Sequence, residues 1–249
     1  MDRKWIFAGA AFAMLLAAPV LAKAPGYEAA VADSARPDTD KQLDAERKPA
    51  EMLALAHVKP GMKVMDLIPG KGYFTRLFSV SVGPKGYVYA YQPSELDALY
   101  KGKEPQINAV AKDYKNVAVI HASINKAVAP EALDLVWTSQ NYHDLKDSFF
   151  APADTAQVNK AIYDALKPGG LYVVLDHAAE KGSGVRDTDT LHRIDEDTVK
   201  KEVLAAGFKL AGESNVLRNK ADDRKLKVFD PSIRHKTDQF ILIFRKPGK

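Results

Sequence analysis

The sequence contains no cysteine among its 249 residues. Disulfide bonds, thiolate nucleophiles, cysteine-ligated metals and lipid attachment to an N-terminal cysteine are therefore excluded. The sequence also lacks the G-x-S-x-G motif that holds the nucleophilic serine of many hydrolases, which disfavours that class. Basic residues do not gather in one part of the sequence, because the 36 basic residues are interspersed with 32 acidic ones. The net charge is +4. No nucleic-acid surface is predicted from such a mixture.

Long apolar runs are scarce, and the one that stands out lies at the start of the sequence. Met1 to Lys4 carries charges, Trp5 to Leu16 is apolar, and Ala-Ala-Pro-Val-Leu-Ala follows. These three parts are typical of a secretory signal peptide, here residues 1–22, with cleavage predicted after Ala22 or Ala24. An uncleaved anchor is the alternative, although the run only just reaches spanning length. We expect a periplasmic protein with no stable membrane association after cleavage.

The remaining residues divide into a short arm and one domain. Residues 23–40 are rich in alanine, proline and aspartate without a period, which predicts an extended or loosely packed N-terminal arm. Residues 41–249 have a length typical of a single α/β domain. An amphipathic helix opens this domain, and Lys59-Pro60-Gly61 ends it.

Within the domain, segments with the pattern of strands alternate regularly with segments of helical period. Such alternation demands a parallel sheet covered by helices on both faces. The last two strands have no helix between them, so one of them is expected to be antiparallel. The predicted strands are Lys63–Leu67, Tyr87–Tyr91, Val117–His121, Leu133–Thr138, Leu171–Asp176, Lys209–Leu217 and Gln239–Arg245, and the predicted helices are Tyr73–Val82, Pro105–Tyr114, Asp154–Leu166 and Glu196–Ala206.

The chain is organised around its first strand and the turn that follows. Val64 to Leu67 runs through Asp66 toward Gly70 and Gly72, and an amphipathic segment begins at once. Glycines let the backbone pass close to a ligand, and the start of a helix presents unpaired N–H groups there. We therefore expect a β-carbon at either glycine to occupy ligand space. Thr75 stands where a dinucleotide fingerprint has its third glycine, which favours a ligand with an amino-acid tail.

The stretch Asp66-Leu67-Ile68-Pro69-Gly70-Lys71-Gly72-Tyr73-Phe74-Thr75 resembles the D-x-G-x-G-x-G signature of class I S-adenosylmethionine (SAM) dependent methyltransferases, with Ile68 in place of the first glycine. Its D-x-x-P-G-x-G-Y-x-T form is similar to a group of predicted bacterial methyltransferases with export signals, from about Arg47 to Pro247. The helix-ending turn Lys167-Pro168-Gly169-Gly170 is a further marker of the family. The resemblance implies SAM as the cofactor and a Rossmann-like fold, a seven-stranded, mostly parallel sheet of order 3-2-1-4-5-7-6 with helices on both faces.

Residues that directly follow the strands are the candidates for the site, because ligands gather where the strand order of such a sheet reverses. The usual acidic residue after the second strand accepts bonds from both ribose hydroxyls, but Gln92 stands there, and its nitrogen can only donate. Glu95 could take over that role, or it could be a solvated residue of the next helix. By the resemblance, the cofactor-binding residues are Asp66, Pro69, Gly70, Gly72, Tyr73, Gln92, Ser123, Ile124 and Asn141.

The loops after the fourth and fifth strands carry the titratable side chains of the predicted acceptor side. A pair such as His143-Asp144 can act as a general base with a pKa near neutrality, or it can be a helix-capping aspartate beside a satisfied histidine. The polar loop from Asp176 to Arg193 is expected to form a lid, or it is an ordinary surface loop. The histidines show no H-x-H or H-x₃-H spacing, so no metal ligand is assigned. The predicted catalytic residues are His143, Asp144, His177, Arg186 and His192.

These observations favour an exported SAM-dependent methyltransferase that acts on an oxygen, nitrogen or sulfur of a small-molecule substrate. Methylation of amino groups on bases is disfavoured, because no Pro-Pro-aromatic sequence follows Asn141. The alternative is a ligand-binding protein that kept the fold and lost methyl transfer, which the departures at Ile68 and Gln92 favour. The sequence indicates no oligomeric state.

Overall fold

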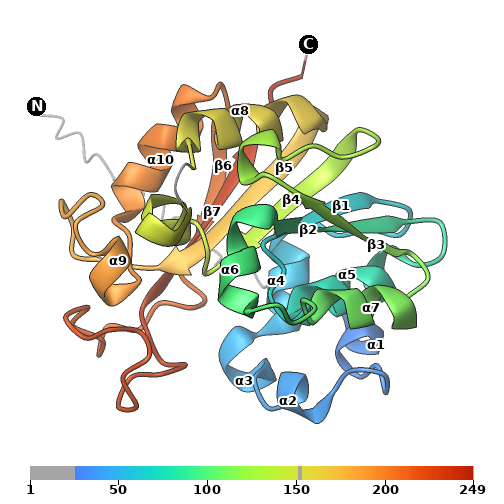
Figure 1. Ribbon diagram of the computed structural model, residues 1–249, viewed down its shortest axis with the longest axis horizontal. Coiled ribbons are helices and arrows are strands. Elements are labelled where there is room, and N and C mark those ends of the chain that lie inside the picture. Colours follow the sequence, from blue (N-terminus) through green and yellow to red (C-terminus); the bar gives the residue numbers. More distant parts are fainter. Residues whose placement is uncertain (1–25, 151–152, 249) are drawn as a thin grey trace, which may run out of the picture.

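A computed structural model describes residues 26–150 and 153–248 of the chain and shows one twisted sheet with helices on both faces (Figure 1). The strand order is β3-β2-β1-β4-β5-β7-β6, as predicted. Neighbours among β1 to β5 run parallel, and β7 lies antiparallel between β5 and β6. The strands are β1 (Lys63–Leu67), β2 (Tyr87–Pro93), β3 (Val117–Ala122), β4 (Leu133–Ser139), β5 (Leu166–His177), β6 (Lys209–Ser214) and β7 (Gln239–Arg245).

Two apolar layers hold the helices on the sheet. One layer contains buried side chains such as Phe74 and Val110, and the other contains Val158 and Val203. The first face carries α1 (Tyr27–Val31), α4 (Pro49–Leu55), α5 (Tyr73–Val82) and α7 (Ile107–Asp113), and the second carries α8 (Thr155–Ala165) and α10 (Glu196–Ala205). Shorter helices are α2 (Asp38–Lys41), α3 (Asp44–Arg47), α6 (Asp97–Tyr100) and α9 (Thr188–Leu191), with 3₁₀ turns η1 (Ser94–Leu96), η2 (Ile124–Lys126), η3 (His143–Lys146) and η4 (Ser148–Phe150).

The strand boundaries that differ most from the prediction are the start of β5 and the end of β6. The helix-ending turn predicted at residues 167–170 is instead part of β5, because Leu166 already pairs with Leu133 of β4 across a register shift. At the other end of the sheet, β6 ends at Ser214 rather than at Leu217. The strands β2 to β5 also run one or two residues past their predicted carboxyl ends, and the order of the sheet is as predicted.

The N-terminal arm is not extended as predicted. Residues 27–31 form α1, whose Ala30 is fully buried in the apolar layer beside α5. The Tyr27 hydroxyl donates to the carbonyl of Val58 at 2.6 Å, and the Arg36 guanidinium donates to Asp44. These long-range contacts outweigh the weak local signal of the segment. The predicted signal peptide lies outside the described residues, and within the part of the chain that is described no helix is long and apolar enough to cross a membrane.

The turn after β1 has a left-handed backbone at three positions. The φ angles are 59° at Ile68, 57° at Gly70 and 81° at Gly72, which is the N-cap of α5. A β-carbon at Gly70 would meet nothing within 4 Å, so space for a ligand remains open there. The expectation that a β-carbon would occupy ligand space is wrong at Gly72, because a β-carbon there would lie 2.8 Å from Cγ2 of Val110 in α7. Gly72 therefore permits the close packing of the turn on α7.

Alanine substitutions separate these two roles of glycine. Each alanine must adopt a left-handed backbone, which costs about 1–2 kcal/mol. At Gly72 the added methyl also meets Val110, and overpacking of this kind costs about 1–3 kcal/mol more. We expect Gly72→Ala to lower the free energy of unfolding more than Gly70→Ala does, as measured by urea denaturation. Equal losses in the two variants would contradict the close contact between the turn and α7.

Candidate functional site

The carboxyl ends of β1 and β4 meet where the strand order reverses. Asp66 of β1 lies opposite Trp137 of β4, and the loop that follows β4 turns back over the glycine turn. The Asn141 amide donates to the carbonyl of Ile68 at 3.0 Å and to the carbonyl of Ser139 at 2.6 Å. Asn141 thus joins the two halves of the predicted site by holding the turn, and its amide nitrogen is already engaged with the protein.

Asp66 lies buried directly before the turn. The Thr75 hydroxyl of α5 donates to its Oδ2 at 2.6 Å, so a residue in place of the third fingerprint glycine fixes the orientation of the carboxyl. Burial raises the pKa of Asp66 to about 7, although the Thr75 hydrogen bond and the nearby Arg47 guanidinium oppose that rise. A carboxyl of this pKa exists in both protonation states near neutral pH, and a cationic ligand would favour the ionised state.

Arg47, at the end of α3, lies near the turn, and the sequence analysis assigned it no role. Its guanidinium stacks on the Tyr73 ring at 4.6 Å and donates to Oε1 of Gln140 at 3.1 Å. The charge of Arg47 also lowers the pKa of Asp66, so a positive charge lies beside the turn. Burial lowers the pKa of Arg47, and neighbouring acidic groups oppose that shift. A lone arginine before a strand carries no motif, so only the fold reveals its position.

Tyr73 and Pro69 do not present polar side-chain groups to a ligand. Tyr73 was predicted to bind the cofactor, and its hydroxyl donates to Asp44 Oδ1 in α3 at 2.7 Å. The Pro69 carbonyl accepts a hydrogen bond from the Gly72 amide at 2.9 Å and closes the turn. Both residues shape the turn, and Tyr73 provides the surface on which Arg47 lies.

Gln92, the penultimate residue of β2, has a buried side-chain amide with weak hydrogen-bond partners. Its exposed fraction is 1%, yet its contacts are long, at 3.4 Å from the Tyr100 hydroxyl and 3.5 Å to the carbonyl of Pro93. A strong hydrogen bond to an amide is about 2.9–3.0 Å long. Buried amides in proteins are normally well bonded, so Gln92 retains capacity for ligand hydroxyl groups.

The residues after β3 already have a protein partner. Glu95 accepts hydrogen bonds from the Ser123 hydroxyl at 2.7 Å and from the Ile124 amide at 3.1 Å. Both oxygens of Glu95 are therefore engaged with the residues that follow β3. These bonds occupy the Ser123 hydroxyl and the Ile124 amide, which belong to two of the residues predicted to bind the cofactor.

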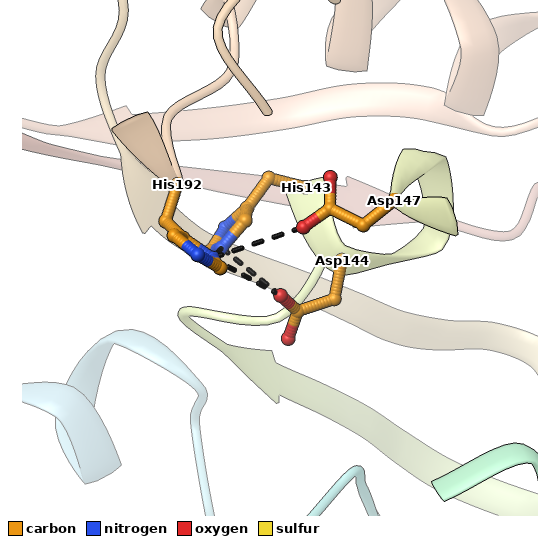
Figure 2. Close-up of side chains that lie close together, drawn as sticks. All are labelled: His143, Asp144, Asp147 and His192. Carbon is orange, nitrogen blue, oxygen red and sulfur yellow. Dashed lines mark hydrogen bonds and ion pairs between the residues drawn. The ribbon is translucent and has the colours of Figure 1, made fainter. Parts of the chain in front are cut away.

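The predicted acceptor side contains a compact His-Asp cluster, shown in Figure 2. His143 Nδ1 lies 2.8 Å from Oδ1 of Asp176 at the end of β5, and its Nε2 lies 3.1 Å from Oδ1 of Asp144. His192 is the residue that follows α9, so it approaches from a different segment. Its Nδ1 lies 3.3 Å from Nε2 of His143. Three of the five predicted catalytic residues thus meet, although 49 positions separate the two histidines.

The electrostatics of His143 do not favour the neutral base that the sequence suggests. Burial disfavours its charged form, but the carboxylates of Asp176 and Asp144 outweigh burial and raise the pKa to about 10. The same contacts help His143 and His192 to lower the pKa of Asp144 against the effect of its burial. At neutral pH this arrangement favours an imidazolium, which donates protons and does not accept them.

His177 and Arg186 do not join the cluster through direct bonds. His177 is buried with its Nδ1 2.7 Å from the Thr237 hydroxyl, and burial places its pKa well below the usual range. Arg186 is exposed and donates to both oxygens of Asp187 at 2.8 Å. Glu180 also pairs with Arg186, so the guanidinium secures the surface of the loop. The loop itself is tied down, since Asp195 accepts from the Gly182 amide at 2.9 Å.

Asp147, which the sequence analysis did not single out, lies at the end of η3 and faces the cluster (Figure 2). Its Oδ2 is 3.7 Å from Nδ1 of His192, and its side chain is fully buried. Burial raises the pKa of Asp147, while a contact with Thr188 opposes that rise. The sequence did not reveal this position, because His192, the C-cap of α9, lies far from Asp147 along the chain.

Asp66 generates a testable dependence of stability on pH. Because its folded pKa of about 7 exceeds the unfolded value of 3.8, the native state holds the proton more tightly. Stability contributed by protonated Asp66 is lost as the pH rises from about 4 to 7. Between pH 5 and 8, the wild-type protein should lose on the order of 2 kcal/mol relative to Asp66→Asn, measured by urea denaturation. Parallel pH profiles of the two proteins would show that Asp66 is ionised throughout this range.

Curated proteins with similar sequences are methyltransferases. The chain is 30% identical over 120 residues to protein-L-isoaspartate O-methyltransferase 1 of Arabidopsis thaliana, a match covering 47% of each chain. It is 33% identical over 130 residues to the ubiquinone/menaquinone biosynthesis C-methyltransferase UbiE of Methylococcus capsulatus, covering 49% of this chain and 46% of the relative. The chain thus spans about half the length of these two curated relatives. No protein-family model matches it.

Solved structures with the same fold cover most of the chain. A SAM-dependent methyltransferase from Aquifex aeolicus superposes with a TM-score of 0.57 at 20% identity, covering 84% of this chain and 98% of the other. The [4+2]-cyclase SpnF superposes with a TM-score of 0.58 at 17% identity, covering 82% of both chains. These identities establish the fold alone. With the sheet order 3-2-1-4-5-7-6, they show that the chain has the Rossmann-like fold of class I SAM-dependent methyltransferases.

Proposed function

We propose that this chain is a SAM-dependent methyltransferase of a small-molecule acceptor and that it works in the periplasm. The observation that carries the proposal is the set of buried polar groups around the open glycine turn, where the strand order reverses. A cation, a carboxyl group and an amide lie around this turn, and they belong to Arg47, Asp66 and Gln92. The similarity to curated methyltransferases over about half of the chain supports the same reaction class.

The side chains present fit the chemical groups of SAM. The free space at Gly70 allows a ligand to lie against the backbone, and the Gln92 amide has bonding capacity for ribose hydroxyls. In this proposal Arg47 binds the carboxylate of the amino-acid tail, and Asp66 binds its ammonium group. Bound SAM supplies an electrophilic methyl group, so the protein must chiefly align an acceptor with it and exclude water.

The acceptor side lies at the ends of β4 and β5 in this proposal. Asp144 and His192 are partly exposed there, so a substrate can reach them, whereas His143 lies behind them. His143 is not assigned as the general base, because its Nδ1 and Nε2 already face Asp176 and Asp144 inside the protein. His177 and Arg186 are not assigned contacts with the acceptor, since each is engaged elsewhere.

A ligand-binding protein without methyl transfer is the second candidate, and Glu95 favours it. The carboxylate of Glu95 already holds the donors of Ser123 and Ile124, on the side where a nucleoside is expected. Formation of S-adenosylhomocysteine from SAM, assayed over a panel of small hydroxyl, amine and thiol acceptors, supports transfer. Tight binding of both compounds with no product from any acceptor supports the second candidate.

Calorimetry with S-adenosylhomocysteine and 5′-methylthioadenosine tests the cofactor and the role of Arg47 together. The second compound retains the nucleoside and lacks the amino-acid tail. We expect Arg47→Ala to weaken S-adenosylhomocysteine binding about 10–100-fold, as lost charged hydrogen bonds do, and to leave binding of the second compound unchanged. Lys41→Ala is the matched control, because this cation of α2 pairs with Asp38 on the surface.

Two results of this calorimetry would count against the proposal. No binding of S-adenosylhomocysteine below about 1 mM by the wild-type protein would remove the cofactor assignment. Equal weakening of both compounds by Arg47→Ala would mean that Arg47 supports the fold of the pocket and does not bind the carboxylate.

The proposed location has its own test. The motivation is the charged, apolar and small-residue order of residues 1–22. Mass spectrometry of the native protein, recovered from a fractionated Gram-negative host, should show a chain that begins near Lys23 or Pro25 in the periplasmic fraction. Recovery of chains with Met1 from the soluble cytoplasmic fraction would contradict export.

A further inference from the structure

Four side chains from two distant segments point their donor atoms at a common centre (Figure 2). His143, Asp144 and Asp147 come from η3 and its C-cap, and His192 comes from the C-cap of α9. One nitrogen or oxygen of each residue lies within 4.8 Å of the corresponding atom of every other. The set contains two imidazoles and two carboxylates, which is a donor set that divalent transition metals accept.

Asp147 provides an independent sign that this cluster can take a ligand. Its side chain has an exposed fraction of 0%, and neither carboxylate oxygen has a hydrogen-bond partner within residues 26–150 and 153–248. The nearby Thr188 hydroxyl donates to the carbonyl of Val185 instead. Buried carboxylates are normally paired, hydrogen-bonded or bound to a metal, and the 3.7 Å separation from His192 is too long for a hydrogen bond.

The hydrogen bonds behind the cluster orient both imidazoles as ligands. Asp176 lies 2.8 Å from Nδ1 of His143, which leaves Nε2 directed at the centre of the cluster. A carboxylate behind a ligating histidine is the arrangement that fixes the ring and its tautomer in metal sites. The His192 ring packs on Phe229 with centroids 5.0 Å apart, and its Nδ1 faces the same centre.

The separations between donor atoms match a small tetrahedral site. Ligands about 2.0–2.1 Å from a zinc ion at tetrahedral angles lie about 3.3–3.4 Å apart. Here Nε2 of His143 lies 3.3 Å from Nδ1 of His192 and 3.1 Å from Oδ1 of Asp144. Nδ1 of His192 lies 3.7 Å from both Oδ1 of Asp144 and Oδ2 of Asp147. The other two separations, from Asp147 to His143 and to Asp144, are at most 4.8 Å.

We propose that His143, Asp144, Asp147 and His192 bind one divalent transition-metal ion of the Zn²⁺ type. Two carboxylates balance the charge of the ion, and two imidazoles favour such a metal over Mg²⁺ or Ca²⁺, which prefer oxygen ligands. The ion clamps α9 to η3 beside the end of β4. The partly exposed Asp144 and His192 form the side through which it enters. This inference goes beyond the proposed function and does not depend on it.

Metal binding is measured on the full chain after chelator treatment and dialysis, without SAM or an acceptor. Zinc sulfate should bind at one ion per chain with a Kd of micromolar or below in calorimetry, and it should raise the Tm by several degrees. Magnesium sulfate at the same concentration should leave the Tm unchanged. Equal responses to the two ions, or no saturable binding of zinc at one equivalent, would overturn the proposal.

Variants separate a metal ligand from a structural ion pair. Asp147→Asn keeps the shape of the side chain and removes the charge, so the metal-free variant should be at least as stable as the wild type and should bind zinc at least tenfold more weakly. His192→Ala should also lose zinc binding. His121→Ala is the matched control, since it removes a half-exposed histidine that pairs with Asp97 at 2.9 Å. That control should bind zinc as the wild type does.

Two outcomes of these variant measurements would overturn the proposal. Zinc binding that survives in both Asp147→Asn and His192→Ala would place the metal elsewhere. A lower Tm of metal-free Asp147→Asn would mean that the carboxylate serves as an ion-pair partner of His192. Binding of S-adenosylhomocysteine, measured in the same samples, tells a failed metal site from a failed cofactor site, because the two are scored by separate ligands.

Discussion

The left-handed backbone at Ile68 is the constraint on which the rest of the site depends. The chain must leave β1 at φ 59° to reach the turn, although a β-branched residue rarely adopts this conformation. Ile68 remains there because its side chain is buried with an exposed fraction of 6%, and because its carbonyl accepts the Asn141 amide. This hydrogen bond also holds the loop after β4, so one backbone conformation sets both halves of the site. Ile68 thus stands at the position of the signature's first glycine with a left-handed backbone, which glycine adopts more readily.

The two halves differ in charge in a way that suits the proposed ligands. Around the turn, the Arg47 cation and the Asp66 carboxyl lie near each other, as a ligand with carboxylate and ammonium groups requires. Past β4 and β5, three aspartates surround two histidines, and the surplus of carboxylates attracts a cation. The site thus combines a place for an amphoteric ligand with an adjacent place for positive charge.

Much of this fold could be predicted from the sequence, because hydrophobic period and turn residues are local signals. The bounds of β1, β7 and α5 were predicted to the residue, and the order of the sheet followed from the resemblance. The site was harder, since it depends on contacts across the chain. Tyr73 was predicted as a ligand contact, but Asp44 takes its hydroxyl. Arg47 and Asp147 carry no motif, and the meeting of His143 with His192 depends on how α9 packs on η3.

The central claim is that SAM lies over the glycine turn at the carboxyl end of β1. Hydrogen–deuterium exchange with and without S-adenosylhomocysteine tests it most directly, because it locates the ligand without an acceptor. The account predicts slower exchange in residues 68–76 and 92–95, with no change at residues 59–62 and 167–170 at the opposite edge of the sheet. Protection confined to that opposite edge, or none at the turn when the ligand is saturating, would contradict the account.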